Sequence, residues 1–162
     1  MKVFRAILVV FHFLLFFGWT AMTYSAIDTT SRPEVHIVRA EFGLFNSSES
    51  GKPLFVPTKT VPLTENQGYG WMIRLVTKKP TIRWREELTL PSAPATWGDG
   101  EIQGVHSISA DRKVSALECE VQPEDGLISN AWVVTPGDPK GHYVIRVTIE
   151  NSLERTFEFD VE

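Results

Sequence analysis

The fold is decided by residues 143–161, which read Tyr-Val-Ile-Arg-Val-Thr-Ile-Glu-Asn-Ser-Leu-Glu-Arg-Thr-Phe-Glu-Phe-Asp-Val. From Tyr143 to Ile149 an apolar residue stands at every second position, and the same alternation resumes from Leu153 to Val161 with Arg155 as its one exception. A period of two is that of a β-strand with one buried face. Asn151-Ser152 between the two runs is a turn signal. The stretch therefore predicts an antiparallel hairpin that packs one face on a core.

The same alternation recurs upstream at short intervals, and no stretch after residue 26 keeps a helical period for three turns. Further strands are predicted over 38–44, 58–63, 69–75, 82–90, 115–121 and 128–134, with turns over 46–53 and 77–80 and a long loop over 91–104. In the first of these strands, the predicted inward residues are Val38, Ala40, Phe42 and Leu44. We predict an all-β, antiparallel β-sandwich of seven or eight strands. A small barrel is the alternative, because periodicity does not separate a closed sheet from two packed ones.

The N-terminal stretch has the layout of a secretory signal. Lys2 and Arg5 supply a positive start, an apolar run follows, and small residues close it, with cleavage after Ser25 or after Ala26. The run to Met22 spans 17 residues, the short end of a bilayer span, so an uncleaved anchor is the alternative. We predict a signal peptide over 1–26, a linker over 27–33 and an exported, periplasmic or extracellular domain over 34–162.

Composition and charge exclude several classes of protein. Cys119 is the only cysteine, so no disulfide forms within the chain and the domain relies on its apolar core. The formal net charge is −4, and it becomes −6 when Lys2 and Arg5 leave with the signal. A nucleic-acid partner requires a basic face, and no cluster of lysine and arginine stands out. We therefore expect no nucleic-acid partner.

Two stretches resemble known bacterial proteins. Trp132 to Val147, together with Phe157-Glu-Phe-Asp-Val, resembles the closing strands of bacterial immunoglobulin-like domains, in which a glycine turn feeds an aromatic residue into alternating valines. The block from Tyr69-Gly-Trp to Trp84-Arg-Glu-Glu-Leu-Thr-Leu-Pro is similar to a family of exported bacterial proteins of unknown function. The resemblance spans most of residues 34–162. It implies an immunoglobulin-like sandwich and no catalytic residues.

The best candidates for a binding site lie in the loop rich in proline and glycine. Trp97 stands outside any alternating pattern, and an exposed tryptophan can stack on a sugar ring or anchor a protein partner. The nearby polar residues Asp99 and Glu101 complete this candidate binding site. The alternative is that Trp97 folds back and caps an open end of the sandwich.

Two residues are expected in or near the core. Cys119 shares the parity of Leu117 and Val121, so its thiol is predicted to face inward and to be inert. Glu86 falls at an inward position between Trp84 and Leu88, where a carboxylate is costly unless it is paired. We expect either a bulge that turns Glu86 outward or an ion pair with an arginine such as Arg74. A functional acid is the third option.

No metal site or catalytic set is assembled by the sequence. His36, His106 and His142 lack the short spacings of zinc sites, and the loop carboxylates, among them Asp111, Glu124, Asp125 and Asp138, fit turn chemistry rather than a calcium loop. The hydrolase patterns Gly-x-Ser-x-Gly and His-Glu-x-x-His do not occur. We expect no cofactor, no metal and no enzymatic activity.

These observations predict an exported binding or structural module. The expected partner is another envelope or extracellular protein, engaged through a sheet edge or loops. A carbohydrate-binding module that uses Trp97 is the alternative. A membrane is expected as a partner only if the N-terminal segment is retained.

Overall fold

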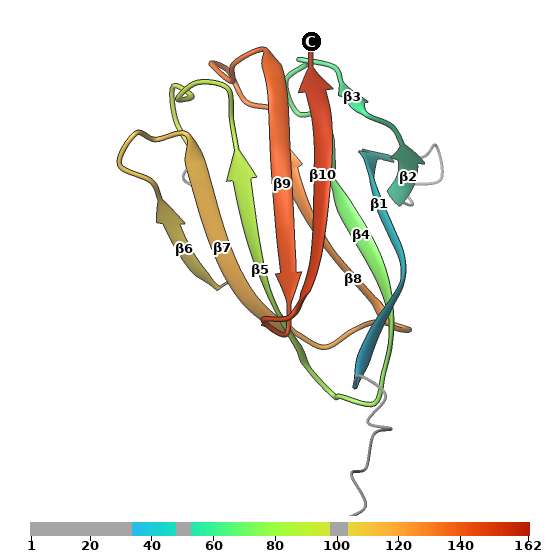
Figure 1. The fold of residues 1–162 in the computed structure, drawn as a ribbon. Coiled ribbons are helices and arrows are strands. Elements are labelled where there is room, and N and C mark those ends of the chain that lie inside the picture. The colour runs from blue at the N-terminus through green and yellow to red at the C-terminus, as the bar shows by residue number, and fades with distance from the viewer. Residues whose placement is uncertain (1–33, 48–52, 98–103) are drawn as a thin grey trace, which may run out of the picture. The chain divides into compact units, whose positions relative to one another are not determined.

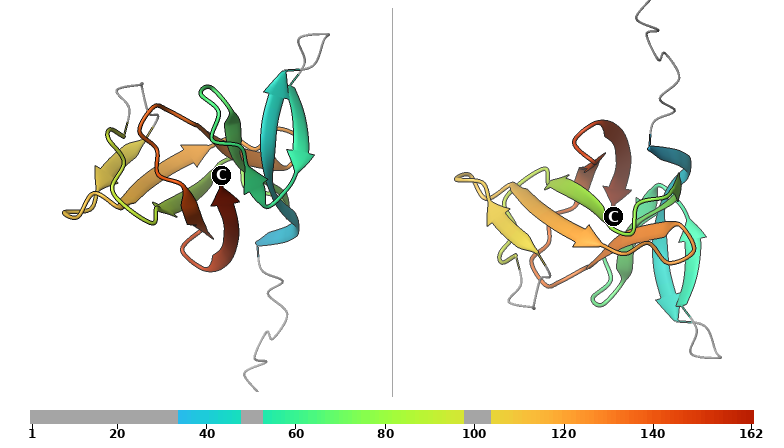
Figure 2. Two further views of the ribbon diagram at one scale, coloured as in Figure 1. Left: turned by 90° about the horizontal axis from the view of Figure 1, so that it is seen from above. Right: turned by 90° about the horizontal axis from the view of Figure 1, so that it is seen from below.

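The computed structural model describes residues 34–47, 53–97 and 104–162. These residues form ten strands and no helix, arranged in two sheets (Figures 1 and 2). No helix in this part of the chain is long and apolar enough to cross a membrane. The predicted signal peptide and linker lie outside the described residues, as do Asp99 and Glu101.

The smaller sheet has four strands, which pair in the order β2-β1-β4-β8, all antiparallel. Its strands are β1 (Val35–Ser47), β2 (Pro53–Pro57), β4 (Gly68–Thr77) and β8 (Leu127–Val133). The central strand is β4, whose burial alternates from Tyr69 to Leu75 as its sequence predicts. The edge strand β8 has one strand partner, β4, within the described residues.

The larger sheet has six strands in the order β3-β10-β9-β5-β7-β6. They are β3 (Thr60–Val61), β5 (Ile82–Thr89), β6 (Val105–Ile108), β7 (Val114–Val121), β9 (Gly141–Ile149) and β10 (Leu153–Val161). The short β3 runs parallel to β10, and every other pair is antiparallel. The predicted C-terminal hairpin is confirmed, because Ile149 pairs with Leu153 and Tyr143 with Phe159.

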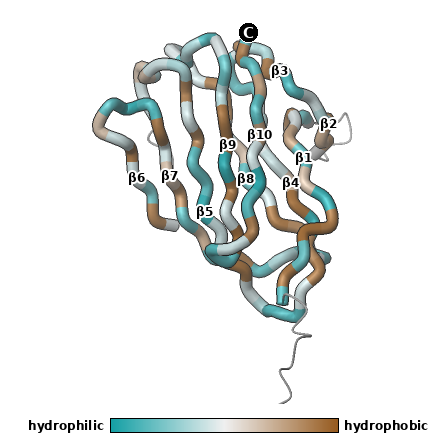
Figure 3. Tube along the Cα trace, in the orientation of Figure 1, coloured by the Kyte–Doolittle hydropathy of each residue, from teal (hydrophilic) through white to brown (hydrophobic). Residues whose placement is uncertain are grey.

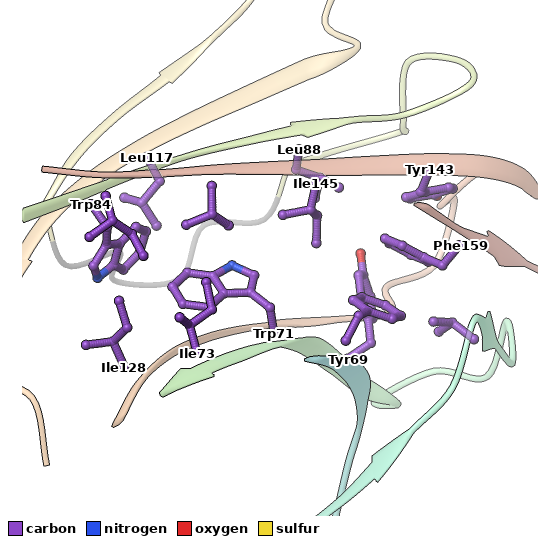
Figure 4. Close-up of a cluster of buried hydrophobic side chains, with 14 of the residues drawn as sticks. Tyr69, Trp71, Ile73, Trp84, Leu88, Leu117, Ile128, Tyr143, Ile145 and Phe159 are labelled. Carbon is purple, nitrogen blue, oxygen red and sulfur yellow. The ribbon is translucent and has the colours of Figure 1, made fainter. Parts of the chain in front are cut away.

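The core lies between the two sheets. Trp71 and Tyr69 of β4 face Leu88, Ile145 and Phe159 of the larger sheet (Figure 4). Brown and teal segments alternate along the strands in Figure 3, as expected when one face of each strand is buried and the other is solvated. The all-β sandwich of mostly antiparallel strands predicted from the sequence is therefore confirmed, with more strands than the seven or eight expected.

The differences from the sequence prediction lie at strand edges. A β-bulge interrupts the pairing of β1 with β4 between Ile37 and Arg39, and Val38 within it is 62% exposed. The prediction that Val38 faces inward is wrong, because the extra residue of a bulge breaks the alternation. The predicted turn over 46–53 is also shorter than expected, since β1 runs to Ser47 and β2 begins at Pro53. Neither β2 nor β6 was predicted as a strand.

Candidate functional site

The most unusual residue of the core is Glu86, in the middle of β5. Its side chain is fully buried, and its partners on the two neighbouring strands are the apolar residues Leu117 and Val147. Pairing with β7 and β9 continues without a register shift through Glu86, so the strand keeps the alternation of its sequence. The expectation of a bulge that turns Glu86 outward is therefore wrong.

The expected ion pair is also absent. Arg74 is exposed, and its guanidinium donates to the backbone oxygen of Asp125 at 3.0 Å. Glu86 instead accepts hydrogen bonds from three neutral donors on the opposite sheet. The Trp71 indole N–H and the Asn130 amide (3.0 Å) bind Oε2, while the Trp132 indole N–H (2.5 Å) binds Oε1. The correction has a physical cause: directed N–H groups compensate a buried carboxylate without any cation.

Burial and hydrogen bonding act in opposite directions on this carboxyl group. Removal from water raises the pKa of Glu86, and the hydrogen bonds from Asn130, Trp71 and Trp132 oppose that rise. The net direction is upward, since desolvation is the largest contribution. Glu86 is therefore a buried group whose charge is sensitive to its three donors. One feature of the sequence could have revealed this site: Asn130, like Glu86, is a polar residue at an inward position of a predicted strand.

Trp97 lies beside this cluster rather than free in solvent. Its ring is half-buried against the core and meets the ring of Trp132 edge-on, with 6.2 Å between centroids. Its indole N–H donates to the backbone oxygen of Arg112 at 3.0 Å. The hollow beside the two tryptophans measures only about 40 Å³ and is also lined by Tyr69 and Asp138. This geometry is that of a residue that covers one end of the sandwich.

Several loop carboxylates in the described residues hold turns. The Asp138 carboxylate accepts from the Thr135 N–H at 2.8 Å, and Asp111 accepts from the Ser109 hydroxyl at 2.6 Å and from the Lys113 N–H at 3.2 Å. These are the side chain-to-backbone bonds of turn chemistry. Within the described ranges, no three metal-binding side chains gather in one place.

The histidines and the cysteine take separate positions. His36 is exposed on β1, His106 contacts the Ser115 hydroxyl at 2.8 Å, and His142 contacts the Asp160 carboxylate at 3.1 Å. Cys119 packs half-buried against the core, and burial raises the pKa of its thiol. A thiol that resists ionisation is a poor nucleophile.

An open groove of about 570 Å³ lies between the two sheets. The groove lies where β1 adjoins β10. It is bounded by Pro57, the last residue of β2, and by Lys59 in the connection from β2 to β3. In Figure 1, β1 and β10 are neighbours on one side of the sandwich. Phe42 and Phe157 contribute apolar surface to it, with 6.4 Å between their ring centroids.

Both strands that border this groove have uncovered backbone. On the side away from β4, β1 pairs with β2 only from Gly43 onward, so no described strand covers residues 35–41 there. On the side away from β9, β10 pairs with β3 only at Asp160 and Val161. Unpaired N–H and C=O groups on a strand edge are a template for another strand. The sequence did not reveal this edge groove, because it depends on how short β2 and β3 are.

Comparison with known proteins places this architecture in a family. Residues 40–162 match the family described as PM0630 beta sandwich domain. The chain belongs to this family. The match covers every strand except the first residues of β1, and it includes the Glu86 cluster and the edge groove. No curated protein matches the chain.

One solved structure supports the fold. An immunoglobulin-like protein (PA1606) from Pseudomonas aeruginosa is similar over 82% of this chain and 100% of its own, with 20% sequence identity and a TM-score of 0.54. The PmoD soluble domain from Methylocystis sp. ATCC 49242 (Rockwell) aligns over 76% of this chain and 90% of its own, with 15% identity and a TM-score of 0.35. At 20% identity the similarity to the Pseudomonas aeruginosa protein concerns the fold, and the immunoglobulin-like sandwich predicted from the sequence is confirmed.

Proposed function

We propose that this protein is an exported binding module that takes up an extended segment of another envelope or extracellular protein in its edge groove. This proposal rests on one observation: the groove combines an apolar floor with two strand edges whose backbone is uncovered. Backbone groups of β1 and β10 supply affinity for any extended chain, and pockets for alternate side chains supply selectivity. The partner segment is therefore extended, with at least one apolar side chain directed at Phe42 and Phe157.

The charges at the groove narrow this partner further. Glu41 is already paired with Arg39 at 2.6 Å, while Glu158 and Lys59 are exposed beside the apolar floor. Because the two exposed charges are of opposite sign, the groove has no strong preference for an acidic or a basic segment. Backbone pairing and the aromatic floor would then dominate recognition.

Site-specific cross-linking tests the groove. A photoreactive phenylalanine analogue is placed at Thr156, which lines the groove, or at Glu118, which is on the outer face of β7. We expect the Thr156 position alone to cross-link to one extended segment of a partner protein in intact cells. Equal cross-linking from both positions, or none from Thr156, would overturn the proposal.

A matched pair of variants then measures recognition of a synthetic peptide with the cross-linked sequence. Phe157→Ala removes part of the groove floor, whereas Leu153→Ala removes a half-buried residue of the same strand outside the groove. We expect Phe157→Ala to weaken the dissociation constant roughly tenfold or more, as a central anchor does, and Leu153→Ala to leave it unchanged. If both variants bind the peptide as the unmodified protein does, the groove is not the site.

Export is tested on the same cells. Mass spectrometry of the protein outside the cytoplasm should give a chain that begins at residue 26 or 27, and a full-length chain in the membrane fraction would indicate a retained anchor. A full-length chain confined to the cytoplasm would refute export.

On a glycan array we expect no signal, since half of the Trp97 ring is occupied by its contacts. Glycan binding that Trp97→Ala abolishes would favour the carbohydrate alternative.

A further inference from the structure

Glu86 forms a polar link between the two sheets, independent of the edge groove. The carboxylate belongs to β5 of the larger sheet, and its three donors belong to β4 and β8 of the smaller one. The donors are not equivalent. Trp71 is fully buried on the central strand, whereas Asn130 and Trp132 are half-buried on the edge strand β8.

The ionised carboxylate fits this site completely. A carboxylate only accepts hydrogen bonds, and both of its oxygens receive N–H groups here. A protonated carboxyl carries an O–H that needs an acceptor, but the two indole N–H groups only donate, and the Asn130 amide accepts only if it turns its Oδ1 toward the acid and withdraws its N–H. Protonation must therefore displace a donor or leave a buried polar group unpaired. Trp71 has no route to water, so the donors that can leave are Asn130 and Trp132.

Release of Trp132 has a consequence beyond Glu86. The Trp132 ring is the surface against which Trp97 rests, and both rings line the small hollow at this end of the sandwich. If the Trp132 indole turns toward water, the contact between the two rings changes with it. The protonation state of one buried side chain is thus connected to the position of a loop residue at the surface.

We propose that Glu86 is a proton-operated latch between the sheets, which holds β8 and the Trp97 contact in place when ionised and releases them when protonated. Within the part of the chain that the structure describes, no charged side chain acts on this carboxyl group. The ionisable groups that face it are Tyr69 from β4 and Cys119 from β7, and burial raises the pKa of both, so they stay neutral. From β9, Val147 lies opposite Glu86, and burial raises the pKa of Tyr143 on the same strand. From β8 only amide and indole groups face the carboxyl.

The latch has a defined effect on stability. Because burial raises the pKa of Glu86 above its unfolded value, the folded state binds the proton more tightly than the unfolded state. The resulting contribution to stability is complete below the unfolded pKa and is lost as the pH rises through the folded pKa. Low pH therefore favours the folded chain at this group, and it loosens β8 because Glu86 stays out of water while it loses donors that oppose its protonation. The two effects are separable by experiment.

The test follows the indole N–H groups of the full chain by NMR as a function of pH. We expect the exchange rate of the Trp132 indole N–H, divided by that of Trp71, to rise roughly tenfold as Glu86 becomes protonated. The division removes the intrinsic pH dependence that the two indoles share. A ratio that stays constant over the whole pH range in which the protein remains folded would overturn the proposal, and so would a rise in which Trp71 leads.

Variants separate the latch from a general effect of acid. Glu86→Gln carries an N–H₂ group where the acid carries its proton, so at every pH it should show the fast Trp132 exchange, relative to Trp71, that the unmodified protein shows when Glu86 is protonated. Glu87→Gln changes the next residue, which points outward to Arg85 and Arg146, and it should leave the ratio and its pH dependence unaltered. Slow Trp132 exchange in folded Glu86→Gln contradicts the latch. If that variant does not fold, the titration of the unmodified protein alone decides.

Discussion

The outer faces of the two sheets are built on different principles. The face of the larger sheet carries a ladder of ion pairs between neighbouring strands. Arg85 on β5 contacts Glu118 on β7 at 2.6 Å and Glu87 at 2.8 Å. Arg146 on β9 lies 3.5 Å from Glu154 on β10. Along this face, long charged side chains meet across the strands and remain partly in solvent.

The outer face of the smaller sheet is almost uncharged along its centre. Around the glycines, the residues that share this face in the strand register are Phe45, Phe55, Gly43, Gly68, Gly70, Met72, Ala131 and Val133, while the charged residues Arg39, Glu41 and Arg74 share it toward the start of β1. Phe45 and Phe55 meet edge-on at 5.1 Å, and Val133 is 49% exposed. Glycines fill the middle of the face, so it is flat where the other is covered by side chains.

The difference shows what specifies each sheet. On the larger sheet, cross-strand side chains contribute small and separable amounts of free energy. On the smaller sheet, the backbones approach so closely that side chains have no room. A Cβ atom added to Gly70 would lie 2.1 Å from the backbone oxygen of Asn130, and one on Gly43 would lie 2.3 Å from that of Val56. We therefore expect substitutions on the smaller sheet to cost more than those on the larger.

The largest expected effect is that of Gly70→Ala. The new methyl group would push on β8 at Asn130, the residue that also contacts Glu86, and such overpacking costs about 1–3 kcal/mol. Thr148→Ala on the outer face of β9 is the control, with an expected loss below about 1 kcal/mol. Urea unfolding measures both free energies. Equal losses from the two substitutions would remove the distinction between the faces.

A smaller effect is expected from the aromatic pair at the rim of the smaller sheet. A double-mutant cycle of Phe45→Leu and Phe55→Leu should give a coupling free energy of about 0.5–1.5 kcal/mol, as edge-on aromatic pairs do. The coupling should be the same at low and high salt, since neither side chain is charged. A coupling that vanishes in high salt would show that the pair acts through the charges nearby.

Regular alternation made most of the fold predictable. The hairpin of β9 and β10 was predicted because one face of each strand is apolar along nearly its whole length, and its register follows from the turn at Asn151. The strands β2 and β6 were missed because they have five and four residues and owe their existence to β1 and β7. The bulge at Val38 was missed because alternation alone does not reveal an inserted residue.

The candidate site was harder to predict for a related reason. Alternation placed Glu86 inside correctly, but the cost of a buried charge argued against that position. The compensating donors belong to strands far away in the sequence, and only the packing of the two sheets brings Trp71 and Trp132 to it. The edge groove likewise results from the order of the strands in the two sheets, and no sequence motif marks it.

The smallest effect is expected for the charged ladder of the larger sheet. Arg85→Ala removes contacts with Glu87 and Glu118, and all three side chains are between 37% and 46% exposed. Exposed pairs contribute about 0.2–1 kcal/mol each at most, because water screens the attraction and the long side chains lose freedom. Added salt should abolish the difference in unfolding free energy between Arg85→Ala and the unmodified protein. A loss that survives 1 M salt would mean that the aliphatic stem of Arg85 packs on the strand beneath it. In that case side-chain burial would specify the larger sheet as well, and the two faces would differ in charge alone.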